Sequence, residues 1–496
     1  MSGAIKETKS QYHHYIPRFT LRNFTHPVQP QNVPGRHGQR NKHKRQKGHY
    51  PGEEMIYAIN LAGTEPQITE TPVACTFGQM DMYRDFANTP NQHEVEQKLS
   101  RLEANAAQII HKIRKEYEAQ KNGIWITRSE RDILRKFLFI MKYRGPRFRQ
   151  RFDHQLPDEY CADDAEQLRA YMRKKGYKRP VDVWFDNIKV LVDLKMDPEM
   201  KWANELMERI YPDDAKWAII NMQCMYLSIC TPSSQEDEFL LTENSYSIHE
   251  GPNSPGAYTE FHVFAVISPK LIMVLRSFVL PVPEEDQDPD IKEWRQKFYA
   301  LNAALHIDPS HANSCLQDLP VRKARNSYSK VVNGRLIPID GIDRKLRLDD
   351  KFCFEFFPIT TTHVNKINSV MLEESYHIST VAFKSKSGAR KALEFHLTTP
   401  LAQNEFGKRI FETPDDVRLV GFKKLEQAAK QLGSDIAASD IAATCLVLEE
   451  KQEKMEQLTQ LLEKNMPNEP TDTMKTYMKL GEFDVTNWEQ KLTNCS

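Results

Sequence analysis

The stretch HEVEQKLSRLEANAAQIIHKIRKEYEAQ, residues 93–120, shows which secondary structure dominates this chain. Its apolar residues recur every three or four positions, which places them on one face of a helix. A second helix is expected to follow, because Thr127 and Glu130 have the spacing of a capping box and Gly145-Pro146 supplies a stop. Helical spacing continues in four further segments, at about 163–175, 181–195, 198–211 and 214–229.

The period of the apolar residues changes after about residue 238. Short runs rich in Val, Ile and Phe are bounded there by Gly, Pro and Ser, as is typical of strands and their turns. We therefore predict an α+β fold that is predominantly α-helical, with a small, mostly antiparallel β element near 238–280 and 351–384. The predicted strands are 55–61, 239–244, 261–267, 270–278, 351–359 and 377–384, and a helix is predicted at 363–375.

Charge and composition exclude several classes of protein. The 496 residues contain 68 Lys plus Arg and 68 Asp plus Glu, so no global field attracts a polyanion and any such affinity must be local. The longest apolar stretch, 217–230, is interrupted by polar residues and is shorter than the roughly 20 residues that span a membrane. Eight dispersed cysteines without a CxxC pair favour a reducing compartment. With no secretory signal at the start, we predict an intracellular protein, cytoplasmic or nuclear, without a membrane partner.

Several familiar catalytic motifs are absent. The chain has no GxxxxGK[ST], no GxGxxG after a strand, no HExxH and no GxSxG, which argues against P-loop, zincin and serine-hydrolase chemistry. His37, His43 and His49 are six residues apart and lack Cys or carboxylate partners, so no metal site is predicted. The sequence does not identify a cofactor.

The segment HYIPRFTLRNF, residues 14–24, concentrates polar side chains around a proline. His14 is a candidate for proton transfer, and Arg18, Arg22 and Asn23 are candidates for binding a phosphate or carboxylate. The alternative is structural: the apolar residues of the segment anchor a surface turn in which Arg18 pairs with an internal acid. Both interpretations stay open at this stage.

A basic run follows the helix that ends near Gly145. Arg144 and Arg147 are candidate phosphate ligands, although cations near a helix C-terminus also complement the helix dipole. Because Arg147 follows the Gly-Pro break and can turn back toward the core, we expect Arg147 to be structural and Arg144 to be the more exposed of the two.

Polar residues also stand at the end of a predicted strand. Glu243 and Asn244 precede a loop with His249, and a carboxylate beside an imidazole suits acid–base chemistry. An Asx-type turn with an exposed acid is the structural alternative. Asn368 is a further candidate ligand on the helix at 363–375, where a cross-linking role is the alternative.

The segment from His14 to Phe24 resembles the opening of the family known as domain of unknown function 4238, which begins His-hydrophobic-hydrophobic-Pro-Arg-x-x-Leu-x-x-Phe. The likeness continues in order through MIYAINL, the helix ending RGPRF, and Ile267-Ser268-Pro269. Glu243 stands where the family usually has Asp, and Ser245 where it usually has Pro. The resemblance covers about residues 11–384, where we expect a family-like helical core with a small sheet. The residues themselves predict a basic loop insertion at 27–53 and a C-terminal helical extension at 385–496.

Two hypotheses about function follow. The first is a polar ligand-binding protein for phosphate-bearing or nucleic-acid ligands, with hydrolysis as its candidate reaction. In a site that also includes Asn244, His14 would transfer protons, the arginines would bind phosphate, and Glu243 would orient water or act as base. The second is a non-catalytic helical scaffold or partner-binding protein whose polar motif is structural. A helix at 436–465, with apolar residues every seven positions, is the candidate surface for a protein partner.

Overall fold

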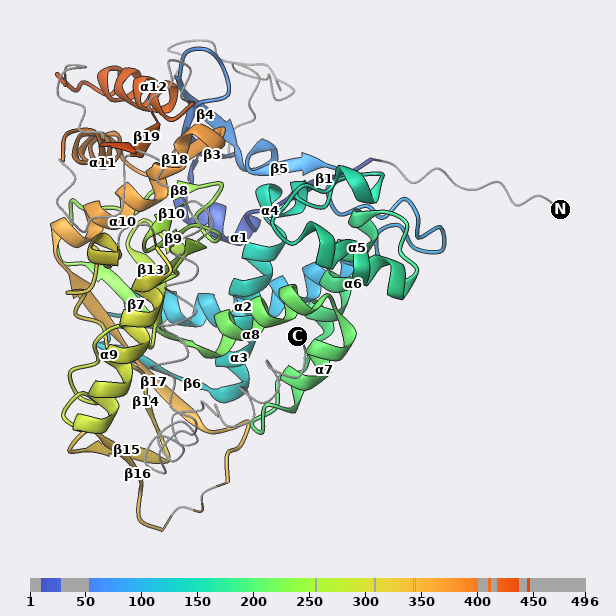
Figure 1. Cartoon of the computed structure of the whole chain (residues 1–496). Coiled ribbons are helices and arrows are strands. Elements are labelled where there is room, and N and C mark those ends of the chain that lie inside the picture. The colour runs from blue at the N-terminus through green and yellow to red at the C-terminus, as the bar shows by residue number, and fades with distance from the viewer. Residues whose placement is uncertain are drawn as a thin grey trace, which may run out of the picture.

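The computed structural model describes residues 10–27, 53–254, 257–306, 309–341, 343, 345–399, 409–411, 417–436 and 444–446. Figure 1 shows a strand-rich part on the left of the view and a helical part on the right, with α2 and α3 between them. The helices of the first half are α1 (Arg18–Leu21), α2 (Glu94–Glu118), α3 (Arg128–Tyr143), α4 (Pro146–Gln150), α5 (Ala165–Lys175), α6 (Pro180–Asp193), α7 (Lys201–Arg209) and α8 (Pro212–Gln223).

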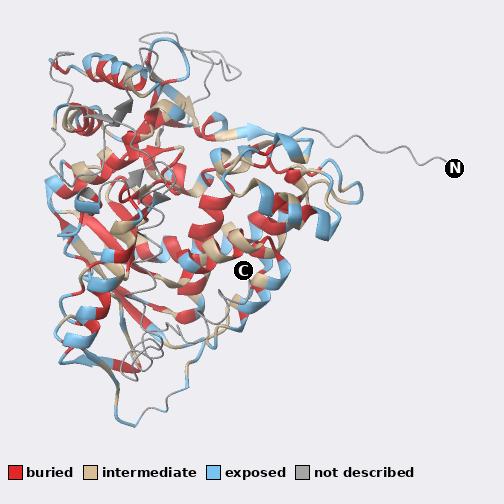
Figure 2. Ribbon diagram, in the orientation of Figure 1, coloured by how far each residue is buried: buried red, intermediate tan, exposed pale blue. Residues whose placement is uncertain are grey.

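Local sequence explains the two long helices. The apolar stripe of α2 is buried, from Val95 to Ile113. The capping box before α3 is present: the Thr127 side chain accepts from the Glu130 backbone N–H, and Glu130 accepts from the Thr127 backbone N–H. Figure 2 shows that the buried residues lie along the strands and on the helix faces that pack against them.

The largest sheet has seven strands in the order β14-β17-β7-β13-β12-β9, with β6 also pairing with β17. β17 and β7 run parallel, and the other pairs are antiparallel. The strands are β6 (Gly123–Thr127), β7 (Met225–Pro232), β9 (His249–Glu250), β12 (His262–Ser268), β13 (Leu271–Ser277), β14 (Arg325–Asn326) and β17 (Lys351–Ile359).

A second, antiparallel sheet has five strands in the order β2-β3-β18-β8, with β4 pairing with β3. They are β2 (His26–Pro27), β3 (Glu54–Asn60), β4 (Gln67–Pro72), β8 (Leu241–Thr242) and β18 (Thr380–Phe383). The two-stranded pairs are β1 (Tyr12–His14) with β5 (Gly78–Met80), β10 (Asn253–Ser254) with β11 (Ala257–Tyr258), β15 (Ser329–Val332) with β16 (Arg335–Pro338), and β19 (Arg409–Phe411) with β20 (Thr444–Leu446).

The later helices cover the sheets. α11 and α12 share a hydrophobic core with β3 and β18, in which Ile59, Val381, Leu393 and Leu425 are buried. These helices are α9 (Pro289–Ala304), α10 (Thr361–Glu373), α11 (Lys386–Thr398) and α12 (Val417–Gln431), and the short 3-10 helices are η1 (Arg22–Phe24), η2 (Val73–Cys75), η3 (Pro157–Glu159), η4 (Pro309–His311) and η5 (Ser375–His377).

The prediction of an α+β protein with only a small, mostly antiparallel β element is wrong in the size and type of its β structure: the fold is α+β, with several sheets that include a seven-stranded mixed one. The main error lies at residues 214–229, which were expected to be one helix. The helix α8 ends at Gln223, and β7 begins at Met225. Seven of the eight residues of β7 are buried, so the strand reads as a continuous apolar run that periodicity does not distinguish from a buried helix.

Two predicted segments fall largely outside the described residues. Of the basic segment 27–53, residues 28–52 are not described. Of the predicted helix at 436–465, only residues 436 and 444–446 are described, and Thr444–Leu446 form a strand instead. Among the described helices, none is long and apolar enough to cross a membrane.

Candidate functional site

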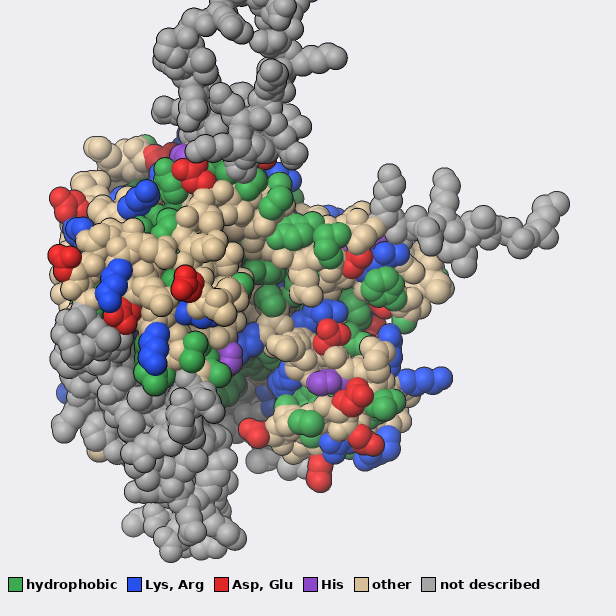
Figure 3. Space-filling view, turned by 90° about the horizontal axis from the view of Figure 1, so that it is seen from above, with side chains coloured by type: hydrophobic (Ala, Val, Ile, Leu, Met, Phe, Trp, Pro, Cys, Tyr) green, Lys and Arg blue, Asp and Glu red, His purple; other side chains and the backbone are tan. Residues whose placement is uncertain are grey.

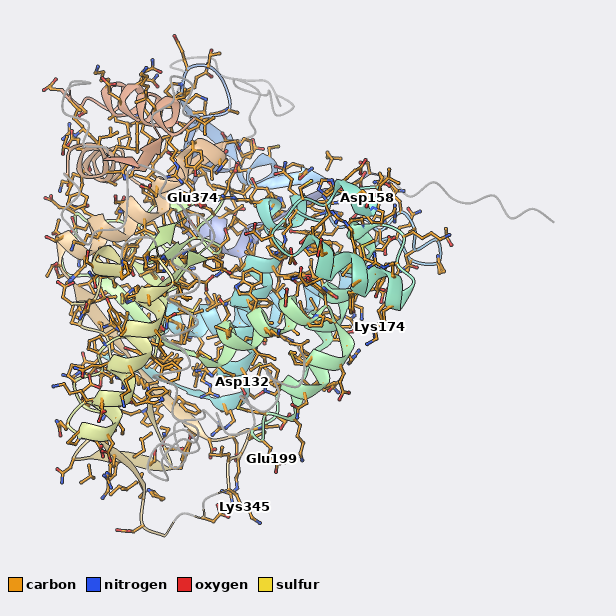
Figure 4. All side chains as sticks on the ribbon, in the orientation of Figure 1. Asp132, Asp158, Lys174, Glu199, Lys345 and Glu374 are labelled. Carbon is orange, nitrogen blue, oxygen red and sulfur yellow. The ribbon has the colours of Figure 1, made fainter. Side chains whose placement is uncertain are left out.

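The helix α3 links two polar regions of the molecule. It has 16 residues and therefore spans about 24 Å. The segment that contains the opening motif packs against its C-terminal half, and a cavity opens beside its first turns. Asp132 lies near the start of α3, and Glu374 pairs with Arg147 just beyond its end. The two residues are well separated in Figure 4.

The opening motif is anchored to α3. The Phe19 ring lies 6.0 Å from the ring of Phe137, and Nη2 of Arg144 donates to the Tyr15 carbonyl at 3.2 Å. Before the proline, the motif forms β1 and pairs with β5. A Cβ at Gly78 would lie 2.4 Å from the Tyr12 ring, so this close pairing needs glycine.

His14 is held in a defined orientation. Its Nδ1 donates to the Thr76 carbonyl at 3.0 Å, which leaves Nε2 as the basic nitrogen. Burial lowers the pKa of His14, and the nearby Arg18 and Arg144 lower it further against the raising effect of the Thr76 carbonyl. Arg18 is exposed and makes no ion pair with any described residue. His14 is therefore a neutral base beside a solvent-facing cation.

The remaining ligand candidates of the motif bond within the fold. Arg22 pairs with Glu54 at 2.9 Å. Asn23 donates to the Ile267 carbonyl at 2.7 Å and accepts from Arg114. These contacts tie η1 to β3, β12 and α2.

Glu243 and Asn244 follow β8. The Glu243 carboxylate accepts from the backbone N–H of Ser379 at 3.1 Å and from the Ser379 hydroxyl, and it hydrogen-bonds with Tyr15. Burial first, and then Glu243, raise the pKa of Tyr15. Glu243 therefore contacts Tyr15, the residue that follows His14, but it does not contact His14 itself.

Asn244 and Asn368 have different surroundings. The Nδ2 of Asn244 is buried without a hydrogen-bond partner among the described residues, and its Oδ1 accepts from the Thr242 hydroxyl at 2.5 Å. Asn368 lies apart from the motif: its amide bonds to the Leu240 N–H at 2.9 Å and the Glu238 carbonyl at 2.8 Å, which fixes α10 to the strand leading into β8.

The expected exposure of the two arginines is reversed. Arg144 is only 1% exposed and pairs with Glu103 at 2.5 Å, whereas Arg147 is 57% exposed and pairs with Glu374 at 2.5 Å. The reason is that α3 ends at Tyr143 with Arg144 as its cap residue, still facing the core, while Arg147 lies on the outer side of α4. From above, the described surface is hollowed between the strand-rich and helical parts, with Lys and Arg side chains at the edge of the hollow (Figure 3).

The second polar region is a cavity of about 930 Å³ at a fork in the seven-stranded sheet. β7 and β17 pair only through residues 229–232 and 356–359. On the N-terminal side of these residues, β7 pairs with β13, whereas β17 pairs with β6 and β14. Met225 and Leu227 line one branch of the fork, and Phe352 and Phe354 line the other. The cavity is a direct result of the way the two strands diverge.

The lining of this cavity is basic and aromatic. Eight basic side chains face three acidic ones. The basic residues are Arg131, Arg135, Arg276, Arg295, Arg322, Lys323, Arg325 and Lys330; the acidic residues are Glu284, Glu285 and Asp318; the aromatic residues are Trp125, Tyr226, Phe278, Trp294, Tyr328, Phe352 and Phe354. Some cations are paired, such as Lys323 with Glu285 at 2.9 Å and Arg295 with Glu285 at 2.8 Å.

Arg276, on β13, is held by a buried polar chain. Its Nη1 donates to Nε2 of His262 at 3.0 Å, and Nδ1 of His262 donates to Glu250 at 2.6 Å. Burial lowers the pKa of His262 against the raising effect of Glu250, so the imidazole is neutral. Arg276 is 2% exposed, and no carboxylate of the described residues forms an ion pair with it.

A second cavity, of about 1070 Å³, adjoins the first and shares Trp125 and Arg325 with it. It lies along the other face of β17, where Cys353, Glu355 and Phe357 line it. Lys121 and Arg325 are balanced there by Glu118 and Glu355, so this cavity has no net charge from its lining.

The cavities were missed from the sequence, although two signals were present. Arg128 and Arg131 lie in the first turn of α3, where the helix dipole disfavours cations, and Arg135 follows one turn later. A second basic run, Arg322 to Lys330, contains only one aromatic residue, Tyr328, and no acid. The described residues hold no group of His, Cys, Asp and Glu arranged to bind a metal ion, and the described cysteine side chains are free thiols.

These features define an α+β protein with a mixed seven-stranded sheet and a basic, aromatic cavity at the fork of that sheet. The chain belongs to the family described as protein of unknown function, DUF4238, whose sequence model matches residues 12–387. No curated protein and no solved structure matches the chain.

Proposed function

We propose that this protein binds a phosphate-bearing ligand in the cavity at the β7–β17 fork. The observation that carries the proposal is Arg276, a fully buried guanidinium that lines the cavity and has no carboxylate in contact. A buried charge is costly unless an opposite charge compensates it. Glu250 compensates this one only through the intervening imidazole of His262, and a bound anion would do so directly.

The other cations of the cavity support the same ligand class. Arg131 lies near the N-terminus of α3 and lines the cavity, where it pairs with Asp132 at 2.8 Å and adds its guanidinium to the positive lining. Arginine forks also match the geometry of phosphate oxygens. Lys330 is exposed and forms no ion pair with a described residue, so its ammonium is available to a ligand.

Calorimetric titration with tripolyphosphate and with ATP, in the absence of divalent cations, tests the proposal. Lys330→Glu should weaken binding of both probes at least about fivefold and reduce the slope of log K against log salt by about 1. The control is Lys174→Glu on α5, whose exposed side chain lies on the far side of the helical part (Figure 4). Failure of both probes to bind the wild-type protein, or equal losses in the two variants, would contradict the proposal.

A second candidate function, acid–base hydrolysis, rests on the opening motif. The observation that favours it is the bond from Nδ1 of His14 to the Thr76 carbonyl, because it aims a neutral imidazole with a free Nε2 beside Arg18. In this proposal His14 takes a proton from water, Glu243 and Asn244 orient groups next to it, and Arg18 binds the negative charge. Arg144 and Arg147 keep their pairs with Glu103 and Glu374, and Arg22, Asn23 and Asn368 position the surrounding elements.

A further inference from the structure

Trp125 is an unusual residue for its place in a strand. It lies in the middle of β6 between Ile124 and Ile126, which are 4% and 1% exposed, yet Trp125 itself is 48% exposed. A large aromatic side chain kept in solvent loses the free energy that its burial would provide. The ring of Trp125 lines both cavities, and an exposed aromatic ring beside basic side chains is what stacks the bases of single-stranded nucleic acids.

Arg325 stands on the same face as Trp125. In the sheet, Trp125 is opposite Cys353, and Cys353 is opposite Arg325. Residues directly opposite one another in antiparallel strands project to the same face. Two strand spacings separate Trp125 from Arg325, which is about 10 Å. Arg325 is 70% exposed, and its ion pair with Glu355, at 3.5 Å, is on the surface.

The two cavities differ in charge and share this pair of residues in their linings. The first carries the excess of cations, whereas the charges that line the second are balanced and its ring-bearing residues include Tyr117, Phe356 and Phe357. Each cavity has about the volume of a complete small-molecule site, about 300–1,000 Å³. A single mononucleotide would therefore leave one of them empty.

We infer that the ligand is a single strand of nucleic acid that passes from one cavity into the other, with one base stacked on Trp125 and the adjacent backbone phosphate at Arg325. This inference rests on the proposed phosphate site and specifies its ligand. Phosphates enter the basic cavity, and further bases lie against the aromatic residues of the neutral one. A duplex does not fit, because its bases are stacked on one another and do not present a face to Trp125.

The test compares full-length wild-type protein with Trp125→Ala and Trp125→Phe. Anisotropy of labelled dT12 and rU12 should show a loss of affinity of roughly 5- to 140-fold in Trp125→Ala, which corresponds to the stacking of one base. Trp125→Phe should recover part of the affinity, and a hairpin duplex should bind at least tenfold more weakly than dT12. The matched control is Phe86→Ala, because Phe86 is another exposed aromatic residue, at 59%, outside both cavities.

The salt dependence of binding distinguishes the contribution of the Trp125 ring from that of the cations. Trp125→Ala should leave the slope of log K against log salt unchanged, whereas Arg325→Ala should reduce it by about 1. Tripolyphosphate should bind Trp125→Ala as well as it binds the wild type. Unchanged dT12 and rU12 affinity in Trp125→Ala, or equal binding of the duplex, would overturn the inference while leaving the phosphate site in place. If tripolyphosphate does not bind the wild type, the proposed function itself fails.

Discussion

Nη1 of Arg276 donates a hydrogen bond to Nε2 of His262 across 3.0 Å, deep in the seven-stranded sheet. Because arginine has no acceptor, this bond requires a lone pair on Nε2 and places the imidazole proton on Nδ1, which donates to Glu250. Glu250 also accepts from the Ser314 hydroxyl at 3.0 Å and the Cys315 N–H at 2.8 Å. The chain of bonds orients Arg276 without a direct carboxylate contact and leaves only its Nε without a hydrogen-bond partner among the described residues.

Protonation of His262 should destabilise the fold. Its folded pKa is lowered from 6.5, so as the pH falls below about 6.5 the unfolded chain takes up the proton first and unfolding is favoured. Asp214 acts in the opposite direction, because burial raises its pKa to about 6. Between pH 7.5 and 5.5 the melting temperature should therefore fall less in His262→Gln than in the wild type. The control is His111→Gln, an exposed residue of α2, which should follow the wild type; parallel curves for all three proteins would refute this assignment.

Arg276→Lys should cost stability although it keeps the charge. The guanidinium donates to His262 and to the carbonyls of Leu316, Pro281 and Gln317, and one ammonium cannot reach all four acceptors. A buried acceptor left without a donor costs about 1–3 kcal/mol. Urea denaturation should show a loss of at least that size, compared with almost none for Arg322→Lys, whose side chain is 61% exposed. Equal urea midpoints for the two variants would show that the hydrogen bonds of the Arg276 guanidinium do not contribute to stability.

Urea denaturation should also show that Arg144 and Arg147 contribute differently to stability. Arg144→Ala leaves Glu103 without its partner in a mostly buried place and should cost about 3 kcal/mol, whereas Arg147→Ala breaks an exposed pair and should cost less than about 1 kcal/mol. A double-mutant cycle with Glu103→Gln isolates the Arg144–Glu103 coupling. A coupling near zero would mean that Arg144 contributes mainly through the Tyr15 carbonyl and its packing.

The sequence correctly predicts the features that depend on the spacing of residues close together in the chain. The stripe from Val95 to Ile113 and the Thr127 capping box are confirmed, because both depend on residues within one or two turns of a helix. The family and the six predicted strands, each of which overlaps an observed strand, followed from similarly short patterns. The strand β7 did not, because burial on both faces removes the alternation that identifies a strand.

The cavities depend on contacts that no local pattern contains. The fork forms because residues 225–228 pair with β13, about 50 residues further along the chain, while residues 351–355 pair with β6, more than 200 residues earlier, and with β14. Similarly, the Tyr15–Glu243 bond joins positions far apart in the chain. The sequence could indicate Glu243 and His14 as candidates, but only the three-dimensional arrangement shows which side chains meet.

The hydrolase proposal predicts a specific pH dependence for His14. If Nε2 of His14 is the general base, the wild type should hydrolyse bis(p-nitrophenyl) phosphate, and the ascending limb of the rate should lie below pH 6.5, because burial and the neighbouring arginines lower the pKa of His14. His14→Ala should reduce the rate by about 10²–10⁴ and remove that limb. Its effect on stability should be only about 1 kcal/mol, since one hydrogen bond to Thr76 is lost.

Two controls distinguish this role from a structural one. Glu243→Gln keeps an oxygen to accept from Ser379 but removes the charge, so it should lower the rate more than it lowers the melting temperature. His111→Ala removes an exposed histidine from α2 and should change neither quantity. A rate for His14→Ala equal to that of the wild type would exclude His14 as the base. If His14→Ala instead unfolds the protein, so that Tyr15 no longer docks on α3, the motif is structural and the cavity at the β7–β17 fork remains the site to pursue.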